Sequence, residues 1–136
     1  MRLDLYQAET RRVAQAQCAV LEEARAILAQ GRAWSGLEQG GVLHALQVLA
    51  ENAIGKAKQL LKAKGQTVPV SAYDAFGAVA ALGLVPQSDL PGWNAAVGLR
   101  NRIVHDYMNI DTGQIAALVE ERKYQFIADF LNKQFE

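Results

Sequence analysis

The sequence predicts an all-α fold, an up-and-down antiparallel bundle of four main helices and one short helix. Apolar residues recur at steps of three and four along nearly the whole chain, and no stretch alternates for long in the manner of a strand. Capping residues and glycines divide the chain into segments of helical length. Because 136 residues are enough for one domain but hardly for two, we expect residues 1–136 to form a single domain.

The first two expected helices are the longest. The first runs from about Leu3 to Leu28 and stops before Gly31, since glycine commonly terminates helices. Ser35, followed three residues later by Glu38, has the capping-box pattern and predicts the start of the second helix. The apolar pattern of that helix continues until Gly65, which is its expected end.

Three further helices are expected in the second half of the chain. Ser71 is a candidate N-cap for a short third helix that ends near Gly83. The fourth helix starts around Pro91 and ends close to Asn109, and Asp111 begins a capping pattern for one last helix. On the fourth helix we expect these residues to face inward: Trp93, Val97, Leu99, Ile103 and Val104.

The composition excludes several classes of protein. An apolar content of 51% argues against disorder, and no apolar stretch approaches the roughly 20 residues that span a bilayer. The N-terminus lacks the apolar core of a signal peptide, and the lone Cys18 cannot form an internal disulfide, so we expect a cytoplasmic protein without membrane contact. Because the formal net charge is zero, any binding of nucleic acid must come from a local basic patch.

The segment from Arg100 to Tyr107 contains the groups best suited to handle a phosphate. Arg100 carries a permanent charge with forked donors that match phosphate oxygens. His105 can give or take a proton near neutral pH, and Asn101 and Tyr107 add neutral donors and acceptors. The pattern Arg-x4-His-x-Tyr therefore suits metal-free cleavage of RNA.

Helix geometry complicates this interpretation. At about 100° per residue, Asn101 shares a face with His105, and Arg100 nearly aligns with Tyr107. Arg100 and His105, however, lie about 140° apart. Both can reach one phosphate if Arg100 swings round, if the helix unwinds before His105, or if a second copy completes the pocket. From the residues alone, a structural role is favoured, with His105 capping carbonyls and Arg100 pairing with a surface carboxylate.

A family resemblance changes this balance. The run Arg100-Asn101-Arg102-Ile103-Val104-His105-Asp106-Tyr107 matches Arg-Asn-x-x-Val-His-x-Tyr without departure, and in this it resembles the HepT-like ribonuclease toxins of the HEPN superfamily. The long preceding helix, the proline-containing loop before the motif and the Ile110-Asp111 step into a last helix are also similar to this family. The first helix is the least diagnostic part.

The resemblance implies a metal-independent endoribonuclease toxin, in a type VII-like pair with a nucleotidyltransferase (MNT) antitoxin. Such toxins act without a cofactor, as homodimers whose motif helices face each other, and the RNA substrate would be tRNA or mRNA. Arg100 and His105 would be the catalytic pair, and Asn101 matches the polar residue that follows the family arginine. Tyr107 matches a tyrosine that the partner modifies with AMP in some members. Arg102 beside the motif either contacts RNA phosphate or faces solvent.

Two other functions remain open. The chain could be a non-catalytic helical module that binds a nucleotidyltransferase and helps to bind its nucleotide or substrate, or it could be a purely structural dimer. Other candidate residues have structural interpretations. We expect His44 to be partly buried, Cys18 to be a core or interface residue, and Trp34 and Trp93 to belong to the core or an interface. Two histidines and one cysteine offer no recognised metal-binding spacing.

Overall fold

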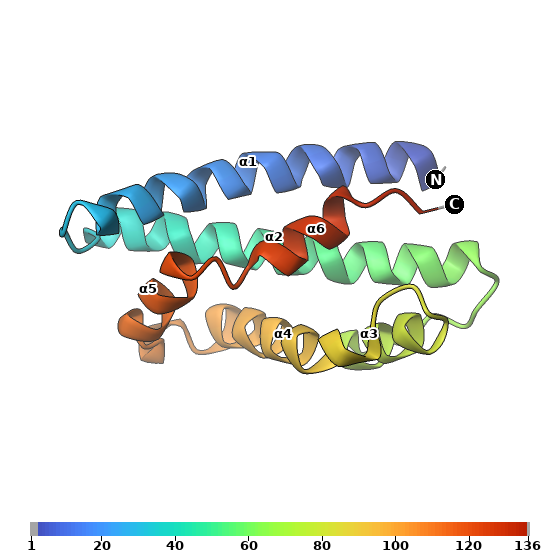
Figure 1. The fold of residues 1–136 in the computed structure, drawn as a ribbon. Coiled ribbons are helices and arrows are strands. Elements are labelled where there is room, and N and C mark those ends of the chain that lie inside the picture. The colour runs from blue at the N-terminus through green and yellow to red at the C-terminus, as the bar shows by residue number, and fades with distance from the viewer. Residues whose placement is uncertain (1–2, 136) are drawn as a thin grey trace.

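The computed structural model describes residues 3–135, and these residues fold into α-helices and short 3₁₀ turns without a strand. Figure 1 shows the helices in order along the chain, and their bounds are α1 Leu3–Ala29, α2 Gly36–Ala63, α3 Ala72–Ala81, α4 Leu90–His105, α5 Thr112–Glu120 and α6 Gln125–Asn132. Single 3₁₀ turns, η1 (Gln87–Asp89) and η2 (Tyr107–Asn109), precede and follow α4. None of the described helices is long and apolar enough to cross a membrane.

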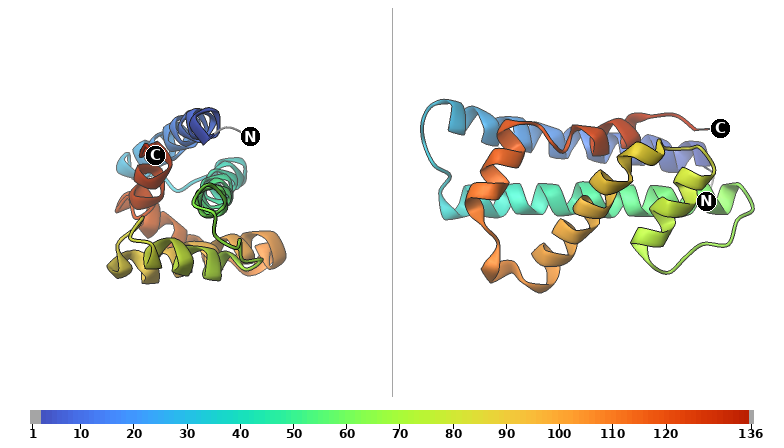
Figure 2. Two further views of the ribbon diagram at one scale, coloured as in Figure 1. Left: turned by 90° about the vertical axis from the view of Figure 1, so that its right-hand side faces the viewer. Right: turned by 60° about the horizontal axis from the view of Figure 1, so that its bottom comes forward.

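Helix α2 is the centre of the bundle. It runs antiparallel to α1 and packs against α1, α3, α4 and α6 (Figures 1 and 2). Helices α3 and α4 form a hairpin on one side of α2, with α4 crossing it obliquely, and α6 returns beside α1 (Figure 2). The buried face of α2 accordingly supplies much of the core: Val42, Leu43, Ala45, Leu46, Leu49, Ala53, Ile54, Ala57, Leu60 and Leu61.

The predicted helix starts are confirmed. Ser35 caps α2 with both halves of the capping box present, and Ser71 and Asp111 accept hydrogen bonds from backbone N–H groups at the starts of α3 and α5. At α2, hydrogen bonds from Arg32 and from the Ser35 backbone to the Glu38 carboxylate lower the pKa of Glu38 to about 2. The predicted glycine stops are also present: Gly31, Gly65 and Gly83, all with positive φ.

Helix α4 ends four residues earlier than the predicted end at Asn109. Its last residue is His105, and Asp106 leaves the helical region with φ −144° and ψ 42°. The Asp106 carboxylate accepts a hydrogen bond from Asn109 Nδ2 at 2.6 Å, which stabilises the 3₁₀ turn that follows. The expectation that Val104 faces inward is also wrong: its side chain is exposed, because only the Trp93–Val97–Ile103 side of α4 meets the core.

The expected single last helix is instead two helices, α5 and α6. Arg122 takes φ +50°, the left-handed conformation that usually requires glycine, and ends α5. Arg122 N–H donates to Val119 and Lys123 N–H donates to Leu118, the hydrogen bonds of a Schellman motif. The Arg122 guanidinium also pairs with Glu22 on α1 at 2.6 Å, and this contact holds the break in place.

A clamp formed by Gln7, Thr10 and Lys56 holds the C-terminal segment. Gln7 exchanges two hydrogen bonds with the backbone of Phe135, and Thr10 Oγ1 lies 3.5 Å from the Leu131 carbonyl. Lys56, fully buried, donates to the carbonyls of Phe130, Leu131 and Lys133 at 2.6, 3.3 and 2.6 Å. The ammonium thus satisfies carbonyls that the end of α6 leaves without helical partners.

Trp93 anchors the first half of α4 in the core. Its ring stacks on Phe76 of α3, with centroids 4.3 Å apart, and meets the edges of Phe126 and Phe130 of α6. Trp34 is partly buried and its indole N–H donates to the Ala24 carbonyl. Trp93 is therefore a core residue, as expected, whereas Trp34 packs against the core without being part of its buried interior. Cys18 is partly buried against the core, and burial raises the pKa of its thiol.

Candidate functional site

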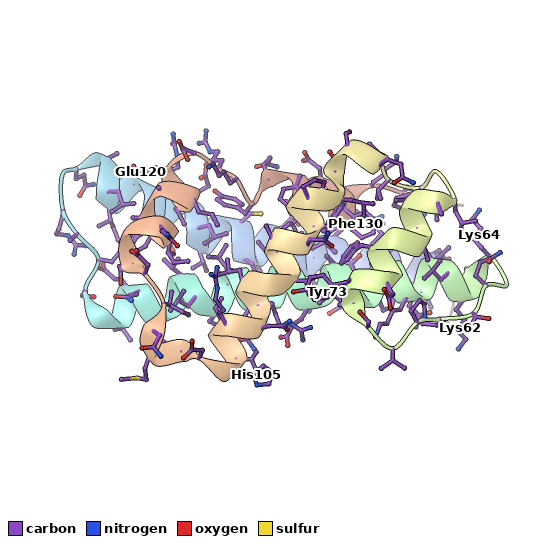
Figure 3. The ribbon with its side chains drawn as sticks, turned by 90° about the horizontal axis from the view of Figure 1, so that it is seen from below. Lys62, Lys64, Tyr73, His105, Glu120 and Phe130 are labelled. Atoms are coloured by element: carbon purple, nitrogen blue, oxygen red, sulfur yellow. The ribbon has the colours of Figure 1, made fainter. Side chains whose placement is uncertain are left out.

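The motif occupies the C-terminal half of α4 and the turn that follows it. Pro91 lies in the first turn of the helix, where its missing N–H costs nothing, and the buried Trp93 fixes the helix against α3 and α6. Figure 3 shows the consequence: α4 carries His105 to the outer edge of the molecule. The first half of α4, which precedes the motif, is therefore anchored in the core, whereas the C-terminal end of the motif is exposed.

Arg100 faces the central helix. Its Nη1 atom lies 3.9 Å from Oε2 of Glu51 on α2, and the arginine side chain is only 26% exposed. The Nε atom is buried and has no hydrogen-bond partner among the described residues. Most of the guanidinium's five donors are thus free, which leaves Arg100 able to bind an anion.

His105 and Asn101 are more open than Arg100. His105 is exposed and points away from the helices in Figure 3. Asn101 is partly buried one turn earlier on the same face of α4. Within residues 3–135, neither side chain has a protein hydrogen bond, so both have donors and acceptors available for a ligand. Among the described residues, His105 thus makes no hydrogen bond to the carbonyls at the end of α4, as a capping histidine would.

Tyr107 lies on the 3₁₀ turn and not on α4, so its expected alignment with Arg100 on one helix face is wrong. Its side chain is 50% exposed, and its hydroxyl lies 3.8 Å from where a Cβ on Gly40 would be. The phenol therefore rests on the first half of α2. Val104 and Met108 beside it are exposed apolar side chains, and Met108 is 90% exposed.

Arg102 points to the other side of α4. It lies about 200° around the helix from Arg100, so the two guanidinium groups do not act on the same surface. Arg102 lines an apolar cavity of about 420 Å³ between α2, α4, α5 and α6, together with Lys123. It has no ion-pair partner in the described part of the chain. This placement does not support direct cooperation of Arg102 with Arg100 on one phosphate.

His44 is exposed, which contradicts the expectation that it is partly buried. It shares the solvent-facing side of α2 with Glu51, two turns further along. Between residues 3 and 135, no three His, Cys, Asp or Glu side chains are grouped closely enough to hold a metal ion.

The structure thus brings together only part of the predicted site. Arg100 meets α2, Asn101 and His105 share the outer face of α4, and Tyr107 covers the start of α2. The contact between Arg100 and Glu51 is not predicted by the sequence pattern. The available signal was Glu51 itself, a carboxylate on the polar side of a helix that is otherwise apolar. A local sequence pattern, however, does not show that α2 packs against α4.

The fold and the site define a class of protein: a helical bundle with an arginine–histidine motif at the exposed end of one helix. A family model described as Ribonuclease HepT-like matches residues 16–133, which include the whole motif. The chain belongs to the HepT-like ribonuclease family. The match begins within α1, so the first half of that helix lies outside it. No curated relative matches the chain significantly.

Solved structures share the fold over nearly the full length. The crystal structure of a mutant MntA-HpeT toxin–antitoxin has a TM-score of 0.79 at 20% identity and covers 95% of this chain and 98% of that chain. A tri-AMPylated Shewanella oneidensis HEPN toxin in complex with MNT antitoxin has a TM-score of 0.73 at 21% identity, covering 98% and 100%. A toxin–antitoxin crystal structure with AMP-PNP has a TM-score of 0.72 at 21% identity, covering 96% and 99%.

Proposed function

We propose that this protein is a metal-independent endoribonuclease toxin that cleaves tRNA or mRNA and is neutralised by an MNT-type nucleotidyltransferase. The observation that carries the proposal is the complete motif at the exposed end of α4 in a chain of the HepT-like ribonuclease family. The similar toxin–antitoxin structures support the choice of partner. We further propose that the protein acts in the cytoplasm, where its RNA substrate and its partner are found.

The proposed chemistry uses the 2′-hydroxyl of RNA as the nucleophile. Arg100 binds the scissile phosphate and stabilises the charge that grows on it, since its guanidinium donors are largely unpaired. His105 transfers a proton, and Asn101 orients His105 or a phosphate oxygen. The products are a 2′,3′-cyclic phosphate and a 5′-hydroxyl end.

A homodimer completes this site in the proposal. Arg100 faces α2 whereas His105 points outward, so one copy presents them in different directions. Two motif helices that face each other bring the His105 of one copy to the Arg100 of the other. Exposed apolar side chains beside the motif, Val104 and Met108, supply surface that such a contact would bury.

The separation of Arg100 from His105 also supports a second candidate function. A bundle that binds a nucleotidyltransferase without cleaving RNA does not need the two residues to meet. In that case the exposed apolar surface around Met108 is the contact for the enzyme, and the charged motif helps to bind its nucleotide or substrate.

Growth arrest separates the two functions. We expect controlled expression of the wild-type chain in bacteria to arrest growth, and His105→Ala to abolish the arrest, because the variant lacks the proton-transfer group. Circular dichroism should show an unchanged helix content, since the His105 side chain is exposed. If the wild-type chain is harmless, or His105→Ala is equally toxic, the catalytic function is contradicted and the binding module is favoured.

Tyr107 is the proposed site of AMP addition. Its hydroxyl is accessible on a half-exposed side chain next to the motif, and an AMP group there adds bulk and a negative charge that competes with RNA phosphate. We expect incubation with the cognate nucleotidyltransferase and ATP to add AMP to Tyr107 and to lower cleavage. Peptide mass spectrometry identifies the site, and Tyr107→Phe is the control. Modification of the Tyr107→Phe variant to the same extent as the wild type would contradict this assignment.

A further inference from the structure

Cleavage by the 2′-hydroxyl needs two proton transfers. One removes the proton of the attacking hydroxyl, and the other delivers a proton to the leaving 5′-oxygen. The motif offers one imidazole, that of His105, and one carboxylate, that of Asp106, which already accepts a hydrogen bond from Asn109 Nδ2 at 2.6 Å. In the proposed mechanism, the second proton-transfer group therefore comes from outside the motif.

Glu51 lies where such a group is needed. Its Oε2 atom is 3.9 Å from Nη1 of Arg100, the residue proposed to bind the scissile phosphate. A phosphate bound at Nη1 of that guanidinium would have Glu51 as its neighbour, because Nη1 is the atom that lies near Oε2 of Glu51 and Nε is buried. Glu51 is 43% exposed, so a substrate can reach its carboxylate from solvent.

The geometry of this pair differs from that of the structural ion pairs in the same protein. Arg122 and Arg32 each bind a carboxylate with two nitrogen atoms at hydrogen-bond distances of 2.6 to 3.0 Å. Arg100 and Glu51, in contrast, are too far apart for a hydrogen bond and touch at a single atom pair. Glu51 instead accepts a hydrogen bond of 3.3 Å from Gln47, one turn earlier on α2. No hydrogen bond closes the Arg100–Glu51 pair, so Nη1 of Arg100 and Oε2 of Glu51 can each make a hydrogen bond with a substrate.

We propose that Glu51 is the general base of the cleavage reaction, an inference that rests on the proposed ribonuclease function. The Glu51 carboxylate takes the proton of the 2′-hydroxyl, and the 2′-oxygen forms a bond to phosphorus. The bond between phosphorus and the 5′-oxygen breaks, and His105 in its protonated form gives a proton to that oxygen. Glu51 ends protonated and His105 neutral, so a proton exchange with solvent restores both groups.

Two tyrosine hydroxyls on neighbouring helices lie within about one helical turn of this region. Tyr73 of α3 places its hydroxyl against Gly98, one turn before Asn101 on α4, and Tyr6 of α1 places its hydroxyl against Gly55, one turn after Glu51. The ionisable groups to consider in a pH profile are therefore Arg100, Tyr73, Tyr6, and, two turns away on either side along α2, His44 and Lys58. Glu51 is the carboxylate among these groups.

The test is the pH profile of RNA cleavage by Glu51→Gln, with Glu23→Gln as the matched control. Glu23 is an exposed carboxylate on α1, outside the motif, so Glu23→Gln removes the same charge as Glu51→Gln. The probe is a single-stranded RNA oligonucleotide that the wild-type chain cleaves. We expect Glu51→Gln to lower kcat at least about 100-fold and to remove the acidic limb of the bell-shaped profile. Glu51→Asp should keep that limb with a lower kcat, and the control should match the wild type.

Other outcomes overturn the inference in distinguishable ways. If Glu51→Gln cleaves with an unchanged kcat and an unchanged acidic limb, Glu51 is not the base, although the ribonuclease function stands. If the KM of this variant falls while kcat is kept or rises, Glu51 only restrains Arg100. If the wild-type chain cleaves no RNA while it remains folded, the proposed function itself fails and this inference fails with it.

Discussion

Arg100→Ala is expected to lower the rate of RNA cleavage by about 10²–10³-fold, whereas Arg102→Ala changes it less than about tenfold. The two arginines are two residues apart on one helix, but they face opposite sides of it. Arg100 meets Glu51 with most of its donors free, while Arg102 lines the apolar cavity beside α5 and α6. Removal of Arg100 therefore removes the group that stabilises the charge on the reacting phosphate, and removal of Arg102 leaves that group in place.

The measurement is single-turnover cleavage of labelled RNA by both variants, with EDTA present throughout. Cleavage that requires an added metal would contradict the metal-independent mechanism. A substrate with one 2′-deoxyribose at the scissile position should resist cleavage, because its nucleophile is missing. Equal losses for Arg100→Ala and Arg102→Ala would show that general loss of positive charge, and not the position of Arg100, controls the rate.

Lys56→Met is expected to lower the free energy of unfolding by about 2–4 kcal/mol at pH 7. Methionine can fill the buried path of the lysine stem, but it leaves the carbonyls of Phe130, Leu131 and Lys133 without a donor. The matched control is Lys58→Met, because Lys58 is more exposed and donates one surface hydrogen bond, to Val70. We expect the control to cost less than about 1 kcal/mol in urea denaturation.

We expect the destabilisation caused by Lys56→Met to depend on pH. Burial lowers the pKa of Lys56 from 10.5 to about 8, with smaller contributions from the charges of Arg11 and Lys133. Between pH 8 and 10.5 the unfolded chain therefore binds more protons at this position than the folded chain, so the contribution of Lys56 to stability rises with pH in this window. The stability gap between wild type and Lys56→Met should widen from pH 7 to pH 9.5, and a constant gap would contradict the lowered pKa.

The parts of the fold that the sequence predicted are those set by local chemistry. The serine and aspartate caps act on N–H groups two or three residues away, and Gly31, Gly65 and Gly83 supply the positive φ that ends a helix. The break after α5 could not be predicted in this way. Its left-handed residue is Arg122, which no local rule favours, and its partner Glu22 is 100 positions earlier in the chain.

The same distinction applies to the candidate site. The motif spacing identified the residues, but their directions depend on where α4 ends, at the C-cap Asp106, whose carboxylate accepts a hydrogen bond from Asn109 in the turn that follows. Likewise, the contact of Arg100 with Glu51 depends on how α4 crosses α2, a tertiary property. The burial of Lys56 could not be predicted for the same reason. In the local sequence, a buried lysine on an apolar helix looks the same as a solvated one, and only the packing of α6 against α2 buries it.

The outward direction of His105 has a consequence for how toxic activity depends on the concentration of the protein. If each working site takes its arginine from one chain and its histidine from another, the number of working sites rises with the square of the protein concentration while pairs are scarce. A cell that makes a few stray copies would then be spared, and one that makes several times more would cross sharply into arrest. An antitoxin would need only to keep the free chain below that threshold, without capturing every molecule.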